Sequence, residues 1–297
     1  MRVLTITGDK RFGPGHERYE LMRSAVDELA VIYWGRDALF PKMPQGSFDV
    51  VTAQDPLGRG LFGLYAAWRK KAQFNVQVHM DLESLQGFRR ALARFVLGRA
   101  DSVRAVSEKI KSQAGKLGAR AGVAVLPLYI DIERFKALKP EPHEGKVVLW
   151  VGRFENEKDP LLALEVFKKI RARGTEASFV MLGTGSLEMR LKEAAAGSPV
   201  SFPGWQDPLS YLAQADVVLS TSKYESWGAS MVEALAAGVP VVAPEVGIAR
   251  EAGATVVSLD MLDQACVQIL QLGMRGQLTV NLLSEEEWVK RWKETLV

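Results

Sequence analysis

Short apolar runs and amphipathic segments alternate along most of the chain. The runs are rich in Val, Ile and Phe and are too short for helices, so they predict strands. The segments between them repeat apolar residues every three or four positions, which predicts helices. The predicted strands of the first half are residues 2–7, 30–35, 48–53, 74–79, 101–107 and 121–127. The predicted helices between them are residues 15–30, 58–71 and 84–101.

The same alternation restarts after residues 136–146 (KALKPEPHEGK), which are rich in proline and charge and predict a linker. The later predicted strands are 147–152, 177–183, 200–204, 216–222 and 239–245, and the later helices are 159–174 and 229–238. Strands that alternate with helices predict parallel sheets covered on both faces. The fold class is therefore α/β, with two Rossmann-like domains, and ligands are expected at the carboxyl ends of the strands, in a cleft.

We place the first domain at residues 1–140 and the second at residues 141–283. Residues 284–297 predict a C-terminal helix, because Ser284 is followed by three acidic residues that suit a helix start. Trp288 and Trp292 lie four residues apart and share one helix face. Two interpretations are open: this face packs on the first domain, which we favour, or the helix packs on its own domain.

The composition is that of an ordinary globular protein. Of the 297 residues, 47% are hydrophobic and 25% are charged, and the length is enough for one large core or two smaller ones. The single cysteine, Cys266, excludes an internal disulfide and favours a reducing, cytoplasmic location. The first residues lack the apolar run of a signal peptide, and no window is apolar enough over its length to predict a membrane span.

The charge is unevenly distributed between the two halves. Residues 1–145 contain 23 Lys and Arg against 16 Asp and Glu, whereas residues 146–297 contain 15 against 19. A basic half suggests an anionic partner, although chance is an equal explanation. Residues 59–71 and 88–99 combine basic with aromatic or apolar residues, which would suit peripheral contact with an anionic membrane on its inner face. The alternative, which we favour, is two ordinary helices with solvated basic faces. We expect no nucleic-acid partner.

Two glutamates mark a candidate site in residues 224–245 (YESWGASMVEALAAGVPVVAPE). Glu225 lies in the loop after a predicted strand, and Gly228 allows close approach of a ligand to the backbone. The start of the next helix offers free amides that suit a phosphate. Glu233, one turn into that helix, could accept hydrogen bonds from sugar hydroxyls. Alternatively, Glu233 only supports its helix and Glu225 is a solvated loop residue.

A second candidate lies after the first predicted strand of the second half. That strand ends at Gly152, and Arg153 and Lys158 follow in the loop. Two cations at a strand's carboxyl end suit a diphosphate, because Arg can chelate two oxygens and Lys acts as a point charge. The alternative is a basic surface loop. Taken together, the two stretches call for a ligand with a diphosphate and a polyhydroxylated part, which describes a nucleotide sugar.

Four stretches carry a resemblance to a known family. VGRFENEKDPLLALEVF resembles the "VGR…EKG…LL.AF" segment of the family-4 glycosyltransferases, and YESWGASMVEALAAGVPVVAPEVGIARE resembles their E-x7-E segment. VLPLYIDIERFK resembles "PNGVD…RF", and ADSVRAVSEKIK resembles "ADAVIAVSE". The motifs occur in the order and spacing of that family, and the resemblance runs through nearly the whole chain. It implies the GT-B fold, two Rossmann-like domains whose parallel sheets face each other across a cleft.

The resemblance also implies an activity. Members are retaining glycosyltransferases that use a nucleotide-diphosphate sugar, such as a UDP- or GDP-sugar, and need no metal or other cofactor. The acceptor would be a glycan, a lipid-linked molecule or a small molecule. Carried over, the catalytic residues would be Arg153, Lys158, Glu225 and His79. The donor-binding residues would be Glu233, Trp227, Gly228, Ala229, Ser226, Gly13, Gly15 and Gly152. Trp205 and Gln206 could contact the base, and a packed Trp in a turn is an equal interpretation.

The sequence departs from the family in places that affect these roles. Its first loop has Gly-Pro-Gly instead of adjacent glycines, so the contacts of Gly13 and Gly15 are open. Ser-Trp-Gly replaces Gly-Phe-Gly after Glu225, so Trp227 could reshape the sugar pocket. Other functions on this architecture are an inactive relative that binds a nucleotide sugar, and a sugar-nucleotide epimerase or phosphorylase. The three histidines do not have the spacing of metal ligands, which argues against a catalytic metal. Gly183 and Gly185 lack the third glycine of a dinucleotide-binding fingerprint, which argues against a dehydrogenase.

Overall fold

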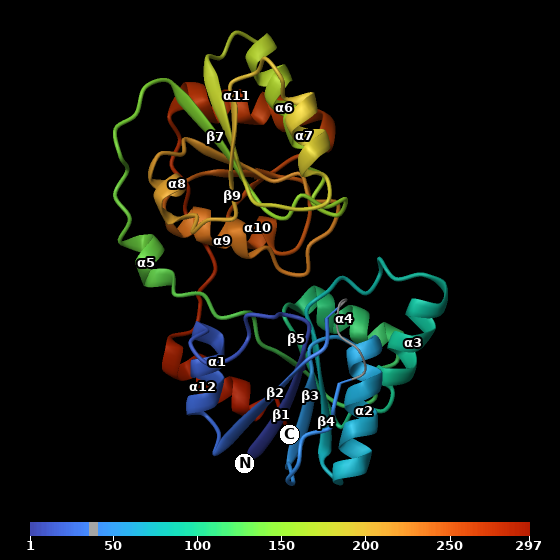
Figure 1. Cartoon of the computed structure of the whole chain (residues 1–297). Coiled ribbons are helices and arrows are strands. Elements are labelled where there is room, and N and C mark those ends of the chain that lie inside the picture. Colours follow the sequence, from blue (N-terminus) through green and yellow to red (C-terminus); the bar gives the residue numbers. More distant parts are fainter. Residues whose placement is uncertain (36–40) are drawn as a thin grey trace. The chain divides into compact units, whose positions relative to one another are not determined.

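The structure, a computed structural model, describes residues 1–35 and 41–297 and divides into two units. Unit 1 contains Met1–Tyr129 and Leu283–Val297, and unit 2 contains Ile130–Leu282. Figure 1 shows the two units with their elements labelled. Each unit is described by itself.

Unit 1 is an α/β unit with six strands and five helices among the described residues. The strands are β1 (Arg2–Thr7), β2 (Glu28–Tyr33), β3 (Val50–Ala53), β4 (Gln73–Val78), β5 (Ser102–Ala105) and β6 (Val123–Val125). The helices are α1 (Glu17–Ser24), α2 (Gly58–Lys70), α3 (Gly87–Leu97), α4 (Glu108–Leu117) and α12 (Glu285–Glu294). The strands form one parallel sheet in the order β2-β1-β3-β4-β5-β6, so all their carboxyl ends lie along one edge.

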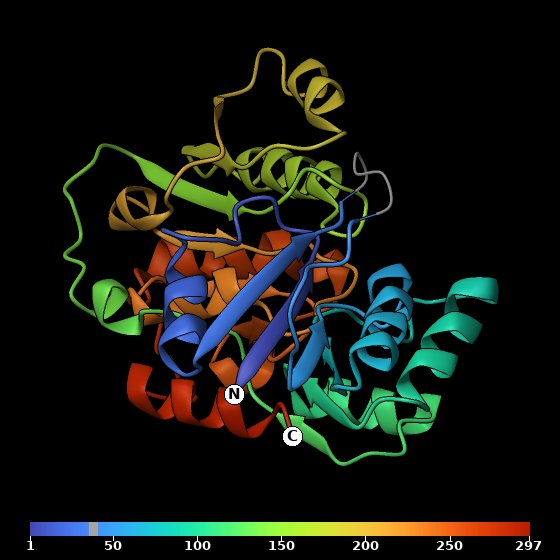
Figure 2. The same ribbon diagram turned by 60° about the horizontal axis from the view of Figure 1, so that its bottom comes forward.

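Helices cover both faces of this sheet, as the sequence predicts. On one face, a glycine of α2, Gly63, lies close to Phe74, Ala53 and Ile6 of the sheet, and a Cβ there would lie only 2.8 Å from the Phe74 ring. On the other face, α1 and α12 lie side by side in blue and red (Figure 2). Strand residues at odd spacings from Ile6 and Ala53, such as Val3 and Val50, point to the other face and belong to the core beneath α1 and α12. This alternation is the period of two that a strand covered on both faces requires.

The C-terminal helix α12 is part of unit 1. Its start is a capping box in which Ser284 and Glu287 bond each other's backbone N–H groups. Trp288 and Trp292 are buried in the core with Phe12 and Met22. The Trp288 Nε1 donates to Pro127 O at 2.8 Å. Unit 1 therefore combines the first 129 residues with the last 15.

The first predicted helix is wrong in its second half. The sequence predicted a helix over residues 15–30, but α1 ends at Ser24 and residues 28–33 form β2. The chain turns at Asp27, whose N–H donates to Met1 O at 3.0 Å. Every residue of β2 then pairs with β1. A short apolar run next to a helix has no periodicity that separates a strand from one more helical turn.

Unit 2 repeats the architecture with its own sheet. The strands are β7 (Lys146–Val151), β8 (Ala177–Leu182), β9 (Val200–Gly204), β10 (Val217–Leu219), β11 (Val241–Ala243) and β12 (Thr255–Val256). The α-helices are α5 (Ile132–Lys136), α6 (Pro160–Ala172), α7 (Glu188–Ala194), α8 (Leu209–Ala213), α9 (Ala229–Ala236), α10 (Ala249–Ala252) and α11 (Leu262–Leu272), and η1 (Leu259–Met261) is a 3₁₀ turn. The parallel order is β12-β11-β10-β7-β8-β9.

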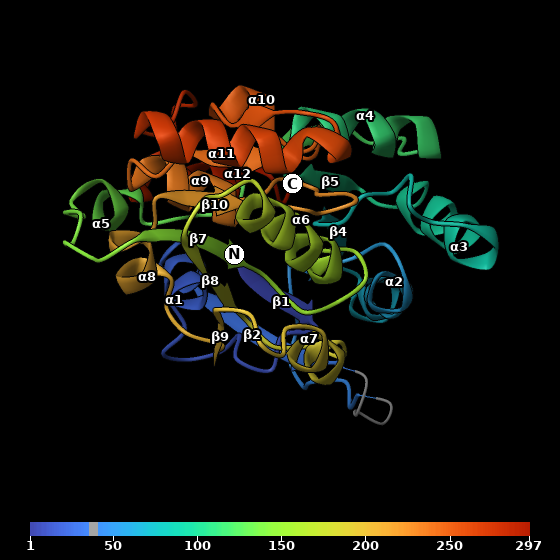
Figure 3. The same cartoon turned by 90° about the horizontal axis from the view of Figure 1, so that it is seen from above.

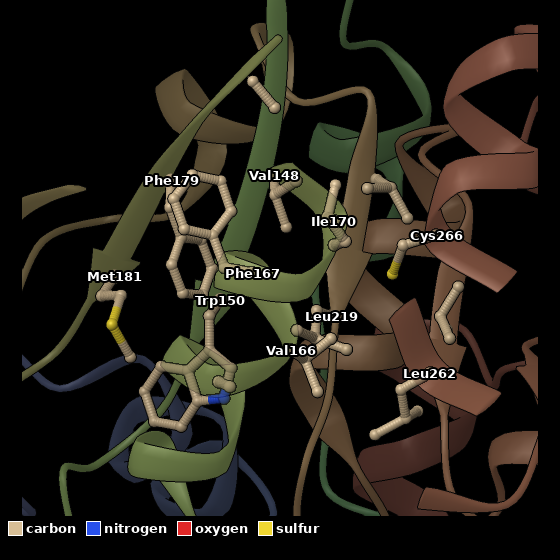
Figure 4. Close-up of a cluster of buried hydrophobic side chains, with 14 of the residues drawn as sticks. Val148, Trp150, Val166, Phe167, Ile170, Phe179, Met181, Leu219, Leu262 and Cys266 are labelled. Atoms are coloured by element: carbon tan, nitrogen blue, oxygen red, sulfur yellow. The ribbon is translucent and has the colours of Figure 1, made fainter. Parts of the chain in front are cut away.

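The core of unit 2 lies between this sheet and two helices. Figure 3 shows α6 and α11 side by side, and both contribute buried side chains. The rings of Phe167 from α6 and Phe179 from β8 stack at 4.8 Å (Figure 4). Cys266 of α11 belongs to the same cluster, and burial raises the pKa of its thiol to about 12. The single thiol is thus a packing residue.

The two units divide at Tyr129 and Ile130, which is earlier than the domain boundary that the sequence suggested at residue 140. The reason is that α5 packs on α9 of unit 2. In addition, Glu141 N donates to Ala213 O at 2.8 Å, so the proline-rich segment lies along unit 2. Within the two described stretches of the chain, no helix is long and apolar enough to cross a membrane.

Candidate functional site

The two candidate loops of unit 2 meet at the carboxyl edge of its sheet. They follow β7 and β10, which are paired neighbours. The Lys158 Nζ forms an ion pair with Glu225 Oε1, and Ser222 Oγ donates to the same oxygen at 2.8 Å. The side chains of Lys158 and Glu225 are 20% and 12% exposed. The structure therefore brings together the cation and the carboxylate that the sequence singled out.

Thr221 fixes the spacing of these loops. Its Oγ1 accepts from Trp150 Nε1 at 3.1 Å and lies 3.0 Å from Lys158 O and 2.9 Å from Asp159 O, to which it donates. In addition, Lys223 N donates to Glu157 O at 2.9 Å. The backbone on both sides of the ion pair is thus held by hydrogen bonds, one of them buried, which fixes the spacing of the two loops.

Arg153 points to a different partner from Lys158. Its guanidinium pairs with Glu157 at 2.7 Å, and its side chain is 61% exposed. Gly152 precedes it, and its N–H donates to Leu182 O at 3.0 Å. Arg153 therefore stands at the exposed side of the loop, within the same turn as Lys158, with a carboxylate that an anionic ligand would have to displace.

Gly183 and Gly185 hold this loop from the side. A Cβ on Gly183 would lie 1.8 Å from Gly152 O, and a Cβ on Gly185 would lie 2.5 Å from Phe154 O. Neither position has room for a side chain, because the opposing atoms are backbone. The Ser186 N–H and Oγ both donate to the carboxylate of Glu155, at 3.0 and 2.7 Å. The two glycines are thus explained by close packing against the Arg153 loop.

In the turn before α9, backbone groups are the ones that a ligand could contact. Gly228 has φ +107° and is the N-cap of α9, and a Cβ there would lie 2.3 Å from the Met231 side chain. Trp227 is buried, and its carbonyl accepts from Ile248 N at 3.0 Å. The side chain of Trp227 therefore packs in the core, and only its backbone is available to a ligand. Ser226 and Ala229 are half-buried on either side.

Glu233 lies in the second turn of α9 and is half-buried. Burial raises the pKa of its carboxyl group to about 7, while the nearby charges of Arg134 and Asp207 act in opposite directions. Arg134 of α5 and Asp207 form an ion pair with each other. Glu233 is thus close to half-protonated at neutral pH and can donate as well as accept a hydrogen bond.

Trp205 and Gln206 follow β9 directly and are exposed. Since all strands of this sheet are parallel, both residues leave β9 at the same edge as the loops after β7 and β10. Sequence reasoning missed Thr221, Ser222 and Arg134. The first two were counted as the end of a strand, and only the sheet order shows which loop they face.

In unit 1 the candidate residues also follow carboxyl ends of strands. Gly13 and Gly15 lie in the loop after β1, where Gly15 has φ +85° and its N–H donates to Glu20 Oε1 at 2.7 Å. His79 follows β4 and is half-buried. Burial, and then the charges of Arg104 and Arg18, hold the pKa of His79 well below its usual range. His79 is therefore uncharged at neutral pH.

No group of three or more His, Cys, Asp or Glu that could hold a metal ion is found in residues 1–35 or 41–297.

Comparison with known proteins identifies the family. Residues 145–272 match the family model of glycosyl transferases group 1, and residues 11–128 match the glycosyl transferase 4-like domain. The first match covers all six strands of unit 2, and the second covers the strands of unit 1 except β1. The chain therefore belongs to the family-4 glycosyltransferases, as its motifs suggested.

Relatives and solved structures agree with this assignment. The chain is 31% identical to a 2-deoxystreptamine glucosyltransferase of Streptomyces kanamyceticus over 53% of this chain and 46% of the relative. It is 28% identical to a phosphatidyl-myo-inositol mannosyltransferase of Mycobacterium tuberculosis over 70% of this chain and 57% of the relative. The chain spans about half the length of the curated relatives it matches.

The fold matches solved structures over nearly the whole chain. The structure of Anabaena Alr3699/HepE in complex with UDP-glucose has a TM-score of 0.72 at 18% identity, covering 92% of this chain and 89% of that one. A sucrose-phosphate synthase from Thermosynechococcus elongatus has a TM-score of 0.71 at 16% identity, covering 99% and 94%. The GT-B assignment is thus confirmed as a fold class, with two six-stranded parallel sheets in an α/β arrangement.

The pKa of Glu233 gives a pH prediction for stability. The folded protein retains a proton that the unfolded chain releases between pH 4.5 and about 7, so Glu233 costs stability as pH rises through this window. Glu233→Gln removes the titration. We expect its melting temperature, relative to the wild type, to rise from pH 4.5 to 7 and then level off. The exposed Glu165→Gln of α6 is the control, and a Glu233→Gln curve parallel to the wild type at all pH values would contradict the prediction.

Proposed function

We propose that this protein transfers a sugar from a nucleotide-diphosphate sugar, a UDP- or GDP-sugar, to a glycan, a lipid-linked or a small-molecule acceptor. The observation that carries the proposal is the Lys158–Glu225 pair at the carboxyl edge of unit 2. A carboxylate would repel a neighbouring phosphate unless the carboxylate binds another group. In this pair Lys158 supplies a cation for phosphate, and Glu225 beside it can accept hydrogen bonds from hydroxyls.

The valences of this pair suit both parts of the donor. Lys158 has three N–H donors and uses one on Glu225 Oε1, so two remain for phosphate oxygens. Glu225 Oε1 accepts from Lys158 and Ser222, and Oε2 accepts no bond among the residues that the structure describes. Oε2 is thus the free acceptor for hydroxyls of the sugar. The amides of Gly228 and Ala229 and the carboxyl of Glu233 would bind phosphate and ribose.

The reaction is proposed to need no metal. As the sugar leaves, negative charge builds on the diphosphate, and Arg153 and Lys158 supply the positive charge that stabilises it. Fixed charges in a dry site are commonly the largest catalytic effect. The alternatives, an inactive relative or a sugar-nucleotide epimerase or phosphorylase, are disfavoured by the residues present. Arg153, Lys158 and Glu225 are all retained, and no further acid or cofactor lysine is assigned to the site.

The donor is identified by a thermal-shift screen with UDP, GDP, ADP and their sugar conjugates, with and without a chelator. We expect one nucleotide to raise the melting temperature equally in both conditions. Lys158→Ala should abolish the shift and lower turnover by about 10²–10³-fold, the usual loss when one electrostatic stabiliser is removed. Lys223→Ala, which removes a neighbouring exposed lysine paired with Asp159, is the control. A shift that requires metal would contradict the proposed metal independence, and normal turnover of Lys158→Ala would place the diphosphate elsewhere.

Retention of the anomeric configuration is proposed as well. The family resemblance favours departure and attack on one face of the sugar, with the leaving phosphate taking the acceptor's proton. NMR of the first product should show the donor's anomeric configuration. An inverted product, or a glycosyl adduct of the protein in mass spectrometry, would overturn this mechanism.

The sequence favoured two ordinary helices with solvated basic faces, but aromatic side chains of α2 and α3 are exposed, so we propose peripheral contact with an anionic membrane on its cytoplasmic side. Helix α3 has an inner apolar stripe (Ala93, Val96, Leu97) and a second, outward one that includes Phe88 and Phe95, which are 80% and 42% exposed. Helix α2 similarly exposes Leu61, Tyr65 and Trp68, and Trp68 is 72% exposed. Residues 57–80 and 86–100 contain eight Lys and Arg and no Asp or Glu. Aromatic and basic groups together suit the surface of an anionic bilayer.

Sedimentation with vesicles tests this location. We expect the protein to pellet at low salt with vesicles that contain phosphatidylglycerol and to stay in solution with phosphatidylcholine alone. Phe88→Ser combined with Phe95→Ser should reduce the bound fraction, since both rings would leave the interface. Met189→Ser, which removes an apolar side chain of α7 that is 76% exposed, is the control. Absence of binding at low salt would exclude the membrane.

A further inference from the structure

A row of buried polar side chains crosses the face of the unit 1 sheet that lies under α12. The row comprises Thr52 of β3, Asn75 and Gln77 of β4, and Ser102 and Arg104 of β5. All five residues are buried, and Arg104 is 0% exposed. We propose that Arg104, acting through Gln77, is a positioning residue that holds His79 as the tautomer with its proton on Nε2, leaving Nδ1 as a hydrogen-bond acceptor.

Arg104 is a buried cation that takes part in no ion pair of the described residues. Its Nε donates to Leu126 O at 3.0 Å, Nη2 to Pro127 O at 2.8 Å and Nη1 to Gln77 Oε1 at 3.0 Å. Burial and the charge of Arg18 lower its pKa to about 9, so it stays charged at pH 7. Apolar residues often replace buried charges at no loss of stability, so this arrangement points to a role other than stability.

The donor and acceptor of each hydrogen bond in the row can be assigned, because a guanidinium group only donates and a carbonyl oxygen only accepts. A guanidinium only donates, so the Gln77 atom that meets Arg104 is Oε1. The other amide atom, Nε2, then donates to Thr52 Oγ1 at 2.9 Å, and Thr52 donates to Asn75 Oδ1 at 2.7 Å. At the far end, Asn75 Nδ2 donates to Thr295 O at 2.8 Å, and a carbonyl only accepts. The row is consistent from one end to the other, with no unsatisfied member.

His79 lies next to Gln77, whose side-chain orientation is fixed by Arg104. Its Nε2 lies 3.3 Å from Gln77 Oε1, which can only accept, so Nε2 carries the proton. The pKa of His79 is held well below its usual range by burial, Arg104 and Arg18, and the remaining nitrogen therefore keeps its lone pair at neutral pH. Nδ1 makes no hydrogen bond with any described residue. It is an acceptor for a ligand hydroxyl, which under the function proposed above belongs to a sugar.

The tautomer is measured by ¹H–¹⁵N NMR of the imidazole rings, independently of activity. The chain has only three histidines, so His79→Gln assigns the signal. In the wild type we expect the proton on Nε2, protected from exchange. Gln77→Met keeps Arg104 and its two carbonyl bonds but removes the acceptor, and should abolish that protection. Arg104→Met should do the same and raise the pKa of His79.

A matched control separates positioning from stability. Ser102→Ala removes a buried member of the same row, bonded to Asn75 at 2.8 Å and to Leu296 O at 3.0 Å, at a distance along the row from His79. It should leave the His79 signal unchanged. Gln77→Met should also lower kcat by about 10-fold to 100-fold with little change in KM, as large as the loss when a metal-bound histidine loses the partner that orients it.

Two outcomes would overturn the proposal. The first is a wild-type His79 with its proton on Nδ1. The second is an equal change of the His79 signal in Ser102→Ala and Gln77→Met, which would show a general loosening of unit 1. If the signals behave as expected while the protein transfers no sugar, the positioning by Arg104 stands and the proposed function fails.

Discussion

The structure of unit 1 depends on hydrogen bonds between its sheet and the last turn of the chain. Asn75 and Ser102, in the middle of the sheet, donate to the carbonyls of Thr295 and Leu296, which lie 220 and 194 residues away in sequence. The last carbonyls of a helix have no partner in the helix itself, and buried amides and hydroxyls are costly without one. These two bonds give partners to two side chains of the sheet and to two carbonyls at the end of α12 at once. Because contacts of such sequence separation form late, unit 1 closes only after unit 2 has been synthesised.

The same edge of each sheet carries the candidate chemistry. In both units every strand is parallel, so loops that are far apart in sequence leave the sheet side by side. In unit 2 this places Lys158 against Glu225, 67 residues further along. The pair is also stabilised from below, by Thr221 and Trp150, and from the side by the tight packing of Gly183 and Gly185 on the Arg153 loop. A site assembled from loops is thereby held by groups in or next to the strands.

Much of this arrangement could be predicted from the sequence. Apolar runs located the long strands, and the periodic segments located α2, α3 and α6, because long elements repeat their buried apolar positions often enough to reveal the period. The strand β2 was predicted two residues too late, at 30–35, and the short helices α7, α8 and α10 were missed, because runs of four to eight residues do not fix a period. Lys158 and Glu225 were found because charges that follow strand ends are unusual enough to stand out. Gln77 and Arg104 were not, since their burial depends on which strands are neighbours and on where α12 docks.

The positively charged residues of the first half act in two physically different ways. The arginines and lysines of α2 and α3 are largely solvated, and their field is long-ranged and screened by salt, which suits attraction to an anionic surface. Arg104 is buried, its charge is shared among carbonyl oxygens, and it acts only on close neighbours such as His79. Both sets count equally in the sequence composition. Raising the salt concentration should separate them, because screening weakens the first kind of interaction and leaves the second almost unchanged.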